Sequence, residues 1–421
     1  MRHTKKVGNA YYRKKEKMRK KQPKQYFFKH EQMDFEIQLI LGSSSSGAAE
    51  IGEVLATVER IPNGDFEAWY CEWYARAERV RAVAEECAGN GHVVSARETY
   101  LRAANYYAAA NIMIDGSKDV SRRTPTWVKQ LECWEAFCAH LEPAAEKIEI
   151  PYENKPMPGY FFKPFGAGPH PVIIFANGSD GSLCGMWGQG VSAALKRGYA
   201  ALVFDGPGQN SMLWLKNIPF RYDWEHVITP IVDTLTARSD VDASRLALSG
   251  ISQGGYWVMR ALAFEHRIAA GIADPGVMDV FTVMSSHLPK SMMKLLEEEN
   301  EEKFNKDMDF AMHFAGKAER QNLAWRMKPY GTDSVYRMFK LAQQYNLRDV
   351  VKQIQCPVFI SDPDNEQYWP GQSQVIYDAL ECPKTISHFS AEDGIDWHCE
   401  PKGRTVYDQR MFDWLASIMP V

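Results

Sequence analysis

Apolar residues between about Gln32 and Leu141 recur at the spacing of α-helices. In residues 67–86 and again in 95–114 they fall three, four or seven positions apart, as in the stripe formed by Trp69, Trp73, Ala77, Val80 and Ala84. Such stripes are typical of amphipathic helices that bury one face. Gly89 and Gly91 lie between the two segments, which predicts a helical hairpin. We therefore expect residues 30–145 to form a helical domain that caps the rest of the protein or mediates dimerisation.

After Glu142 and Pro143 the apolar period changes. Residues 147–152 and 157–163 alternate between apolar and polar positions, as antiparallel strands do. Continuous apolar runs then alternate with helical segments: strands are expected at 171–176, 199–205, 246–248, 269–273, 356–362 and 385–389, and helices at 186–197, 224–239 and 405–418. This order predicts an α/β protein with an open, mostly parallel sheet flanked by helices. We place this domain at residues 146–421.

Residues from about 280 to 347 interrupt the alternation of strands and helices. The run 295–306 is acidic and helical in pattern, and Met, Phe and Trp residues punctuate the remainder. A helical insertion between two strands of a sheet is a common position for a lid. We expect a lid here.

Composition and charge narrow the class of protein. The chain has 421 residues, of which 45% are hydrophobic and 24% charged, with a net charge of −4. These values are typical of a soluble globular protein and do not favour nucleic-acid binding. No apolar run suggests a membrane span or a secretion signal, and the eight cysteines include no C-x-x-C pair. We expect a cytoplasmic protein with free thiols. Residues 1–29 are strongly basic and are expected to form a tail with little order.

Residues 250–254 read Gly-Ile-Ser-Gln-Gly, a match to the G-x-S-x-G motif. An apolar run precedes the motif and a helical pattern follows it, which is the strand-turn-helix context that the motif requires. In such a turn the central Ser is strained, and glycines two positions away avoid a clash. A Gly- and Ser-rich turn without chemistry would give the same five letters. The motif therefore makes Ser252 a candidate nucleophile, and catalysis would also require a histidine and an acid beside it.

Together these elements resemble the α/β-hydrolase fold from about residue 145 to the end. In that fold the catalytic residues follow the order Ser, acid, His. His398 lies between the last expected strand and the final helix, where the resemblance places the general base. His388 is the competing residue, but it falls within the strand pattern, where a packed histidine is expected. We favour His398.

The acid is expected after the strand at 356–362, where three carboxylates occur. Asp364 lies within Pro363-Asp364-Asn365, which has the composition of a tight turn. Glu366 lies four residues before Pro370, where the fold places its acid ahead of the next helix. We rank Glu366 first, Asp364 second and Asp362 third.

The remaining site residues follow from the same resemblance. The oxyanion hole would use the backbone N–H groups of Gln253, after the nucleophile, and of Ser179, in the loop after the strand at 171–176. Aromatic residues are dense in the segments around the expected carboxyl ends of the strands, and some of them are candidates for substrate binding. The candidate substrate contacts are Trp187, Trp224, Tyr256, Asp279 and Trp369; Asp274 is a further carboxylate close to the expected site. We expect neither a cofactor nor a metal ion.

The similarity extends beyond the fold. Six segments resemble the family of 2,6-dihydroxypseudooxynicotine hydrolase, which also includes fungal hydrolases that shorten polyketide chains in melanin pigment synthesis: residues 53–55, 68–69, 91–107, 205–209, 241–252 and 366–372. The resemblance covers roughly residues 30 to 421. Glu366 departs from it, because the family usually has Asp as the acid.

This family implies serine-dependent hydrolysis, often of a carbon–carbon bond beside a ketone. We therefore expect a homodimeric hydrolase that acts on a small aromatic or polyketide-derived β-diketone. Hydrolysis of an ester or a peptide by the same Ser, His and acid is the alternative. Neither nucleic acid nor a membrane is expected as a partner.

Overall fold

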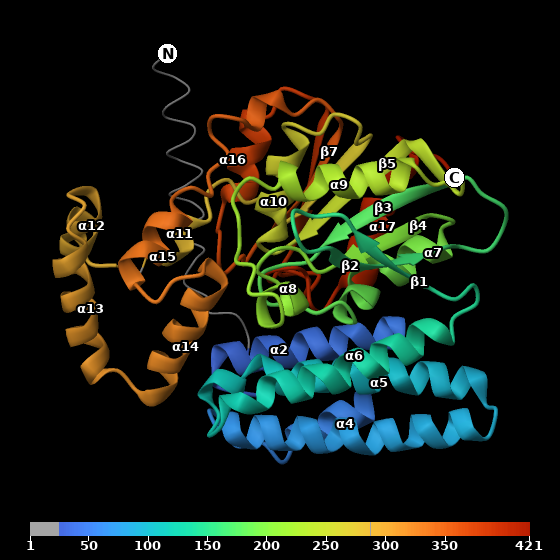
Figure 1. The fold of residues 1–421 in the computed structure, drawn as a ribbon, viewed down its shortest axis with the longest axis horizontal. Coiled ribbons are helices and arrows are strands. Elements are labelled where there is room, and N and C mark those ends of the chain that lie inside the picture. Colours follow the sequence, from blue (N-terminus) through green and yellow to red (C-terminus); the bar gives the residue numbers. More distant parts are fainter. Residues whose placement is uncertain (1–24, 287) are drawn as a thin grey trace.

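The computed structural model describes residues 25–286 and 288–421, and Figure 1 shows their arrangement. Most of the basic tail predicted at residues 1–29 lies outside the described residues. Among the described residues, no helix is both long and apolar enough to cross a membrane.

An eight-stranded sheet forms the centre of the molecule, with strand order β1-β2-β4-β3-β5-β6-β7-β8. Its first two strands are antiparallel to their neighbours and the other six are parallel, which confirms the predicted class. The strands are β1 Glu146–Ile150, β2 Met157–Phe162, β3 His170–Ala176, β4 Ala200–Phe204, β5 Val241–Ile251, β6 Ala270–Asp274, β7 Val358–Pro363 and β8 Lys384–Phe389.

Both faces of the sheet are covered, so the central strands are apolar on both sides. Along β3, Val172 and Ile174 pack against α9 (Glu225–Thr236), α10 (Gly254–Leu262) and α16 (Gln372–Ala379). Ile173 and Phe175 point the other way, toward α7 (Ser192–Lys196), α17 (Arg404–Ala416) and the N-terminal helices. Side chains alternate between the faces of a strand, and this is why the strand reads as one continuous apolar run.

In the part of the chain that the structure describes, five α-helices precede the sheet: α2 Glu31–Gly42, α3 Ile51–Val58, α4 Phe66–Gly89, α5 Val93–Ile112 and α6 Arg123–Ala139. The predicted hairpin is α4 and α5, and Asp65 caps α4 by accepting the Ala68 N–H. Sequence analysis did not identify α6 as a separate helix. Its buried side chains contact both the neighbouring helices and the sheet, so they form no single apolar stripe. On α6, Trp134 packs on Phe137 of its own helix and on Tyr160 and Phe162 of β2. The helices thus share a core with the sheet, and Figure 1 shows α2, α4, α5 and α6 lying together beside it.

The predicted insertion is helical and carries α11 Phe281–Ser285, α12 Lys290–Glu297, α13 Glu301–Phe314, α14 Lys317–Met327 and α15 Val335–Ala342. In Figure 1, α12, α13 and α14 project from the sheet. Within the insertion, α14 contacts the N-terminal helices, because the Arg123 guanidinium on α6 lies 3.8 Å from the ring centroid of Trp325. A bridge between Asp279 and Asn346 closes its base.

Candidate active site

Ser252 lies in a sharp turn between β5 and α10. Its backbone is left-handed, with φ of 58°, which a residue other than glycine adopts only when its surroundings hold it there. The flanking glycines have no room for a side chain. A Cβ on Gly250 would lie 2.3 Å from the Gly254 carbonyl oxygen, and a Cβ on Gly254 would lie 3.0 Å from the Ala176 carbonyl oxygen. The turn therefore has the geometry expected of a nucleophile elbow.

Ser252, His398 and Glu366 form one chain of hydrogen bonds. Ser252 Oγ lies 2.9 Å from His398 Nε2, and His398 Nδ1 lies 2.8 Å from Glu366 Oε2. His398 and Glu366 are almost fully buried, at 3% and 8% exposure. The imidazole is therefore aligned between a hydroxyl and a carboxylate, the arrangement that serine hydrolases use to activate a nucleophile.

The two competing carboxylates lie elsewhere. Asp364 accepts the Ala391 N–H at its Oδ2, and Asp362 forms an ion pair of 2.8 Å with His388. His388 is on β8, as predicted, but it is exposed rather than packed. Geometry thus selects Glu366 among the three ranked candidates.

Glu366 is held by the loop that carries it. Its Oε1 accepts the backbone N–H groups of Tyr368 at 2.9 Å and Trp369 at 3.1 Å, which leaves Oε2 directed at the imidazole. The His398 backbone N–H donates to the side chain of Gln367 in the same loop. Backbone donors therefore fix both the acid and the base before a substrate binds.

The loop after β3 lies against the nucleophile, as expected for an oxyanion hole. A Cβ on Gly178 would lie 2.8 Å from Ser252 Cβ and 3.3 Å from Ser252 Oγ, so the bare backbone faces the hydroxyl. Ser179 follows, and its hydroxyl donates to Asp180. Gln253 occupies the N-cap position of α10. Both predicted donors are thus in the segments that border Ser252.

Gln209 supports that loop, and sequence analysis gave this residue no function. Its side-chain amide donates to the carbonyls of Asn177 and Gly178 at 3.0 and 2.9 Å. Gln209 belongs to segment 205–209, one of the six segments that resemble the family, but only the fold brings it beside the loop after β3.

Three of the proposed substrate contacts pack in the protein instead. Trp224 is fully buried and stacks on Trp257 at a centroid distance of 4.4 Å. Tyr256 is also fully buried, and its hydroxyl donates to the Tyr222 carbonyl. Trp187 fills the junction with the N-terminal helices, where its indole lies 4.8 Å from the Phe137 ring and donates to the Ser46 carbonyl. Their apolar surface is used in the core and in this junction, so these three assignments are corrected.

The other two candidates differ from each other. Trp369 lies 5.8 Å from the His398 ring, so it borders the site. Asp279 accepts hydrogen bonds from Asn346 and Arg348 at the base of the insertion, where its carboxylate serves the fold. Asp274, the further carboxylate close to the expected site, is buried and paired with Arg404 at 2.6 Å.

Two further aromatic residues, Phe35 and Tyr368, lie beside His398, and sequence analysis assigned neither of them as a substrate contact. The Phe35 ring on α2 stacks on Trp397 at 6.1 Å and lies 6.3 Å from the His398 ring. The Tyr368 ring lies 4.7 Å from the His398 ring. Phe35 was counted within a helical pattern, and nothing in that pattern distinguishes a residue facing the core from one facing the site.

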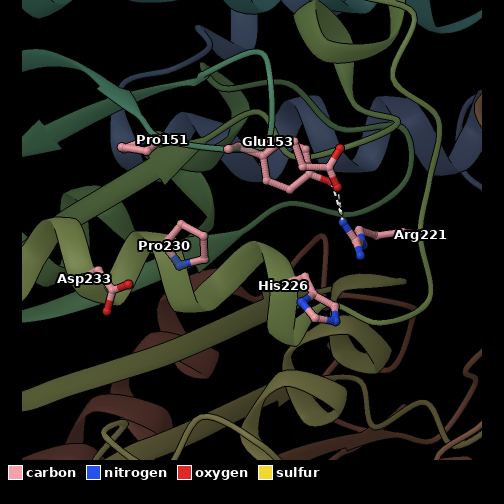
Figure 2. Close-up of a pocket in the computed structure, with 7 residues that line it drawn as sticks. Pro151, Glu153, Arg221, His226, Pro230 and Asp233 are labelled. Atoms are coloured by element: carbon pink, nitrogen blue, oxygen red, sulfur yellow. Dashed lines mark hydrogen bonds and ion pairs between the residues drawn. The ribbon is translucent and has the colours of Figure 1, made fainter.

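A surface pocket of the structure lies apart from this site. Figure 2 shows it between the segment after β1 and helix α9, where Arg221 donates to Glu153 at 2.8 Å. None of the three triad residues lines it. The pocket and the hydrogen-bonded chain at the elbow are therefore separate parts of the molecule.

Comparison with known proteins agrees with the fold. The profile of the prolyl oligopeptidase family matches residues 190–322. The structure is similar to that of 2,6-dihydroxy-pseudo-oxynicotine hydrolase, with a TM-score of 0.68 and 22% identity, covering 90% of this chain and 96% of that one. The fold and the elbow define an enzyme of the α/β-hydrolase superfamily.

Sequence similarity identifies the family within this superfamily. The chain is 30% identical over 413 residues to 20-hydroxy-prefusarin hydrolase FUS2 of Gibberella moniliformis, covering 92% of this chain and 96% of the relative. It is 31% identical over 363 residues to the hydrolase LUC6 of a Fusarium species, covering 82% and 86%. The chain therefore belongs to the family of fungal α/β-hydrolases that contains these two enzymes, and the predicted resemblance is confirmed.

Proposed function

We propose that the protein is a serine hydrolase that cleaves a carbon–carbon bond of an aromatic or polyketide-derived β-diketone. The observation that carries the proposal is the hydrogen-bonded chain Ser252–His398–Glu366. In the first step Ser252 Oγ attacks a carbonyl carbon while His398 Nε2 takes its proton, and Glu366 stabilises the imidazolium. The N–H groups of Gln253 and Ser179 bind the oxyanion.

Collapse of this intermediate breaks the bond to the carbon between the two carbonyls. The electron pair moves onto the departing fragment as an enolate, which then takes a proton at carbon. Water attacks the acyl-enzyme with His398 as base, and the acid product leaves Ser252. The sum is one β-diketone and one water giving one carboxylic acid and one ketone.

Two features favour carbon–carbon cleavage over a simple esterase. The Phe35 ring from the N-terminal helices lies 6.3 Å from the His398 ring, and α14 of the insertion contacts the same helices through Trp325 and Arg123. Exclusion of bulk water protects an enolate from premature reaction and strengthens the hydrogen bonds that stabilise it. The names of the relatives FUS2 and 2,6-dihydroxy-pseudo-oxynicotine hydrolase support a hydrolase acting on a small organic molecule.

Hydrolysis of an ester or a peptide is the second candidate. The match to the prolyl oligopeptidase family favours it, because an ester or amide needs only a leaving group that His398 can protonate.

One experiment tests both candidates. The enzyme and its Ser252→Ala variant are incubated with a β-diketone and an ester that share one aromatic acyl group. We expect the β-diketone to be consumed, and we expect the variant to lose on the order of 10⁶-fold in kcat, as loss of a triad nucleophile does. Consumption of the ester alone rejects carbon–carbon cleavage. Activity of the variant within tenfold of the unchanged enzyme rejects the serine mechanism, as would failure of a fluorophosphonate to label Ser252.

A further inference from the structure

Two polar groups beside the triad have no function in the steps above. One is the carboxyl group of Glu36 on α2, and the other is the phenol of Tyr368 in the loop that carries Glu366. Among the residues that the structure describes, neither group has a hydrogen-bond or ion-pair partner, and both keep partial exposure. Because each group is partly exposed and has no partner within the described protein, each is available to a ligand.

The position of Tyr368 relative to the triad is fixed. Its ring lies 4.7 Å from the His398 ring, and its backbone N–H donates to Glu366. Its own burial and the nearby charge of Glu36 raise the pKa of the Tyr368 phenol. The phenol therefore stays protonated and can donate a hydrogen bond.

Glu36 lies on α2, directly after Phe35 in the chain. The preceding residue, Phe35, packs on Trp397, Tyr368 and His398, so this stretch of α2 lies over the triad. Burial raises the pKa of Glu36 to about 8, and the Asp180 charge in the loop after β3 adds to the effect. At neutral pH the carboxyl group is mostly protonated and is a donor as well.

The charged groups near Glu36 and Tyr368 shift the pKa values of these two residues in opposite directions. Asp180 raises the pKa of both Glu36 and Tyr368, while Arg326 on α14 lowers that of Tyr368 without cancelling the rise. Glu366 also raises the pKa of Tyr368. Both groups therefore favour their protonated, neutral forms, in which each can donate a hydrogen bond.

We propose that Glu36 and Tyr368 form a second oxyanion site, which donates hydrogen bonds to the carbonyl oxygen of the leaving fragment and stabilises it as an enolate. The inference rests on the proposed carbon–carbon hydrolysis. When the bond breaks, the electron pair moves from the C–C bond into the enolate, and its negative charge lies largely on that oxygen. A tyrosine paired with a protonated carboxyl group is a known way to stabilise such an oxygen. The enolate carbon then takes its proton from the His398 imidazolium, and the two donors keep theirs.

This assignment separates two reactions of the same enzyme. An ester of the same acyl group has no second carbonyl, so its alkoxide leaving group makes no use of the pair. Loss of either donor should therefore lower the rate for the β-diketone and leave ester hydrolysis nearly unchanged.

The test uses Glu36→Leu, Glu36→Gln and Tyr368→Phe with the matched β-diketone and ester. We expect Glu36→Leu and Tyr368→Phe each to lower kcat for the β-diketone by about 10²- to 10³-fold, as removal of one oxyanion donor does. Glu36→Gln keeps an N–H donor and should retain most of this activity. Glu31→Leu changes an exposed glutamate on the same helix and should affect neither substrate.

A pH profile adds a readout that a structural defect would not give. The β-diketone rate should fall as pH rises through about 8, where Glu36 loses its proton. This alkaline decline should be absent from the ester profile and from the Glu36→Gln variant. An equal loss on both substrates, or no loss on the β-diketone, overturns the second oxyanion site. If the unchanged enzyme consumes no β-diketone, the proposed function itself fails, and this result is distinct because it needs no variant.

Discussion

Replacing Glu366 by Gln changes one atom and tests the acid assignment directly. In the structure Oε1 accepts two backbone N–H groups, from Tyr368 and Trp369, and Oε2 faces His398 Nδ1. The amide oxygen of Gln must remain with the two backbone donors, because an NH₂ group there would meet two N–H groups. The NH₂ group then faces Nδ1, which can only accept. The imidazole is forced into the tautomer that carries its proton on Nε2, where it cannot remove the Ser252 proton.

The size of the effect follows from that tautomer. A neutral acid that leaves triad geometry intact costs about 10⁴-fold in kcat, which corresponds to about 5 kcal/mol at 1.36 kcal/mol per tenfold. The backbone hydrogen bonds of the loop persist in the variant, so its thermal unfolding should change little. Glu366→Asp shortens the side chain by one methylene and keeps the charge, so its loss should be smaller.

The assay measures kcat for the ester and the rate of labelling by a fluorophosphonate, with Asp364→Asn as the matched control. Asp364 accepts one N–H from Ala391 and makes no contact with His398, so the control should keep activity within a few fold. If Glu366→Gln stays within tenfold of the unchanged enzyme, or if Asp364→Asn is the more damaging change, the acid has been assigned to the wrong residue.

Three further outcomes are expected. Gly250→Ala should destabilise the fold and abolish labelling, because the new Cβ would lie 2.3 Å from the Gly254 carbonyl oxygen; a variant with unchanged Tm and labelling contradicts the close packing of the elbow. A chain lacking residues 1–145 should be poorly soluble or inactive, since these helices share a core with the sheet; normal turnover would make them a passive appendage. Arg404→Met leaves Asp274 buried without its partner and should cost about 3–5 kcal/mol in urea unfolding, and a loss below 1 kcal/mol would argue against the ion pair.

The sheet and its flanking helices were predictable because their patterns are local. Alternating and continuous apolar runs gave the strands within a few residues, and the hairpin of α4 and α5 followed from its stripes. Helix α6 was not separated, since contacts on two sides erase a single stripe. The division into a domain at 30–145 and another at 146–421 stays a prediction, to be tested by the shortened chain.

The triad residues were also predictable, since each follows a particular strand and chain order identifies them. The substrate contacts were not. Trp224 precedes α9 and Tyr256 lies in the helix after the elbow, and both side chains are fully buried in the core. Glu36 and Phe35 lie more than two hundred residues before Ser252, and no local pattern distinguishes a residue over the site from one in the bundle. Position in the sequence therefore led to substrate contacts being assigned to buried residues, and to none being assigned to α2.

One buried group, Asp274, ties the nucleophile to the base. Its carbonyl accepts the Ser252 N–H at 2.6 Å, and its carboxylate accepts from Ser361 and Arg404. Arg404 in turn donates to the Cys399 carbonyl, directly after His398. Burial, reinforced by the Asp274 charge, raises the pKa of nearby Glu400 well above its usual value, which favours the neutral form of that carboxyl group. A strained Ser252 and a loop-borne His398 can hold a distance of 2.9 Å only if both are anchored to one rigid element, and this ion pair at the end of β6 meets that requirement. The Arg404 substitution should therefore lower kcat as well as stability.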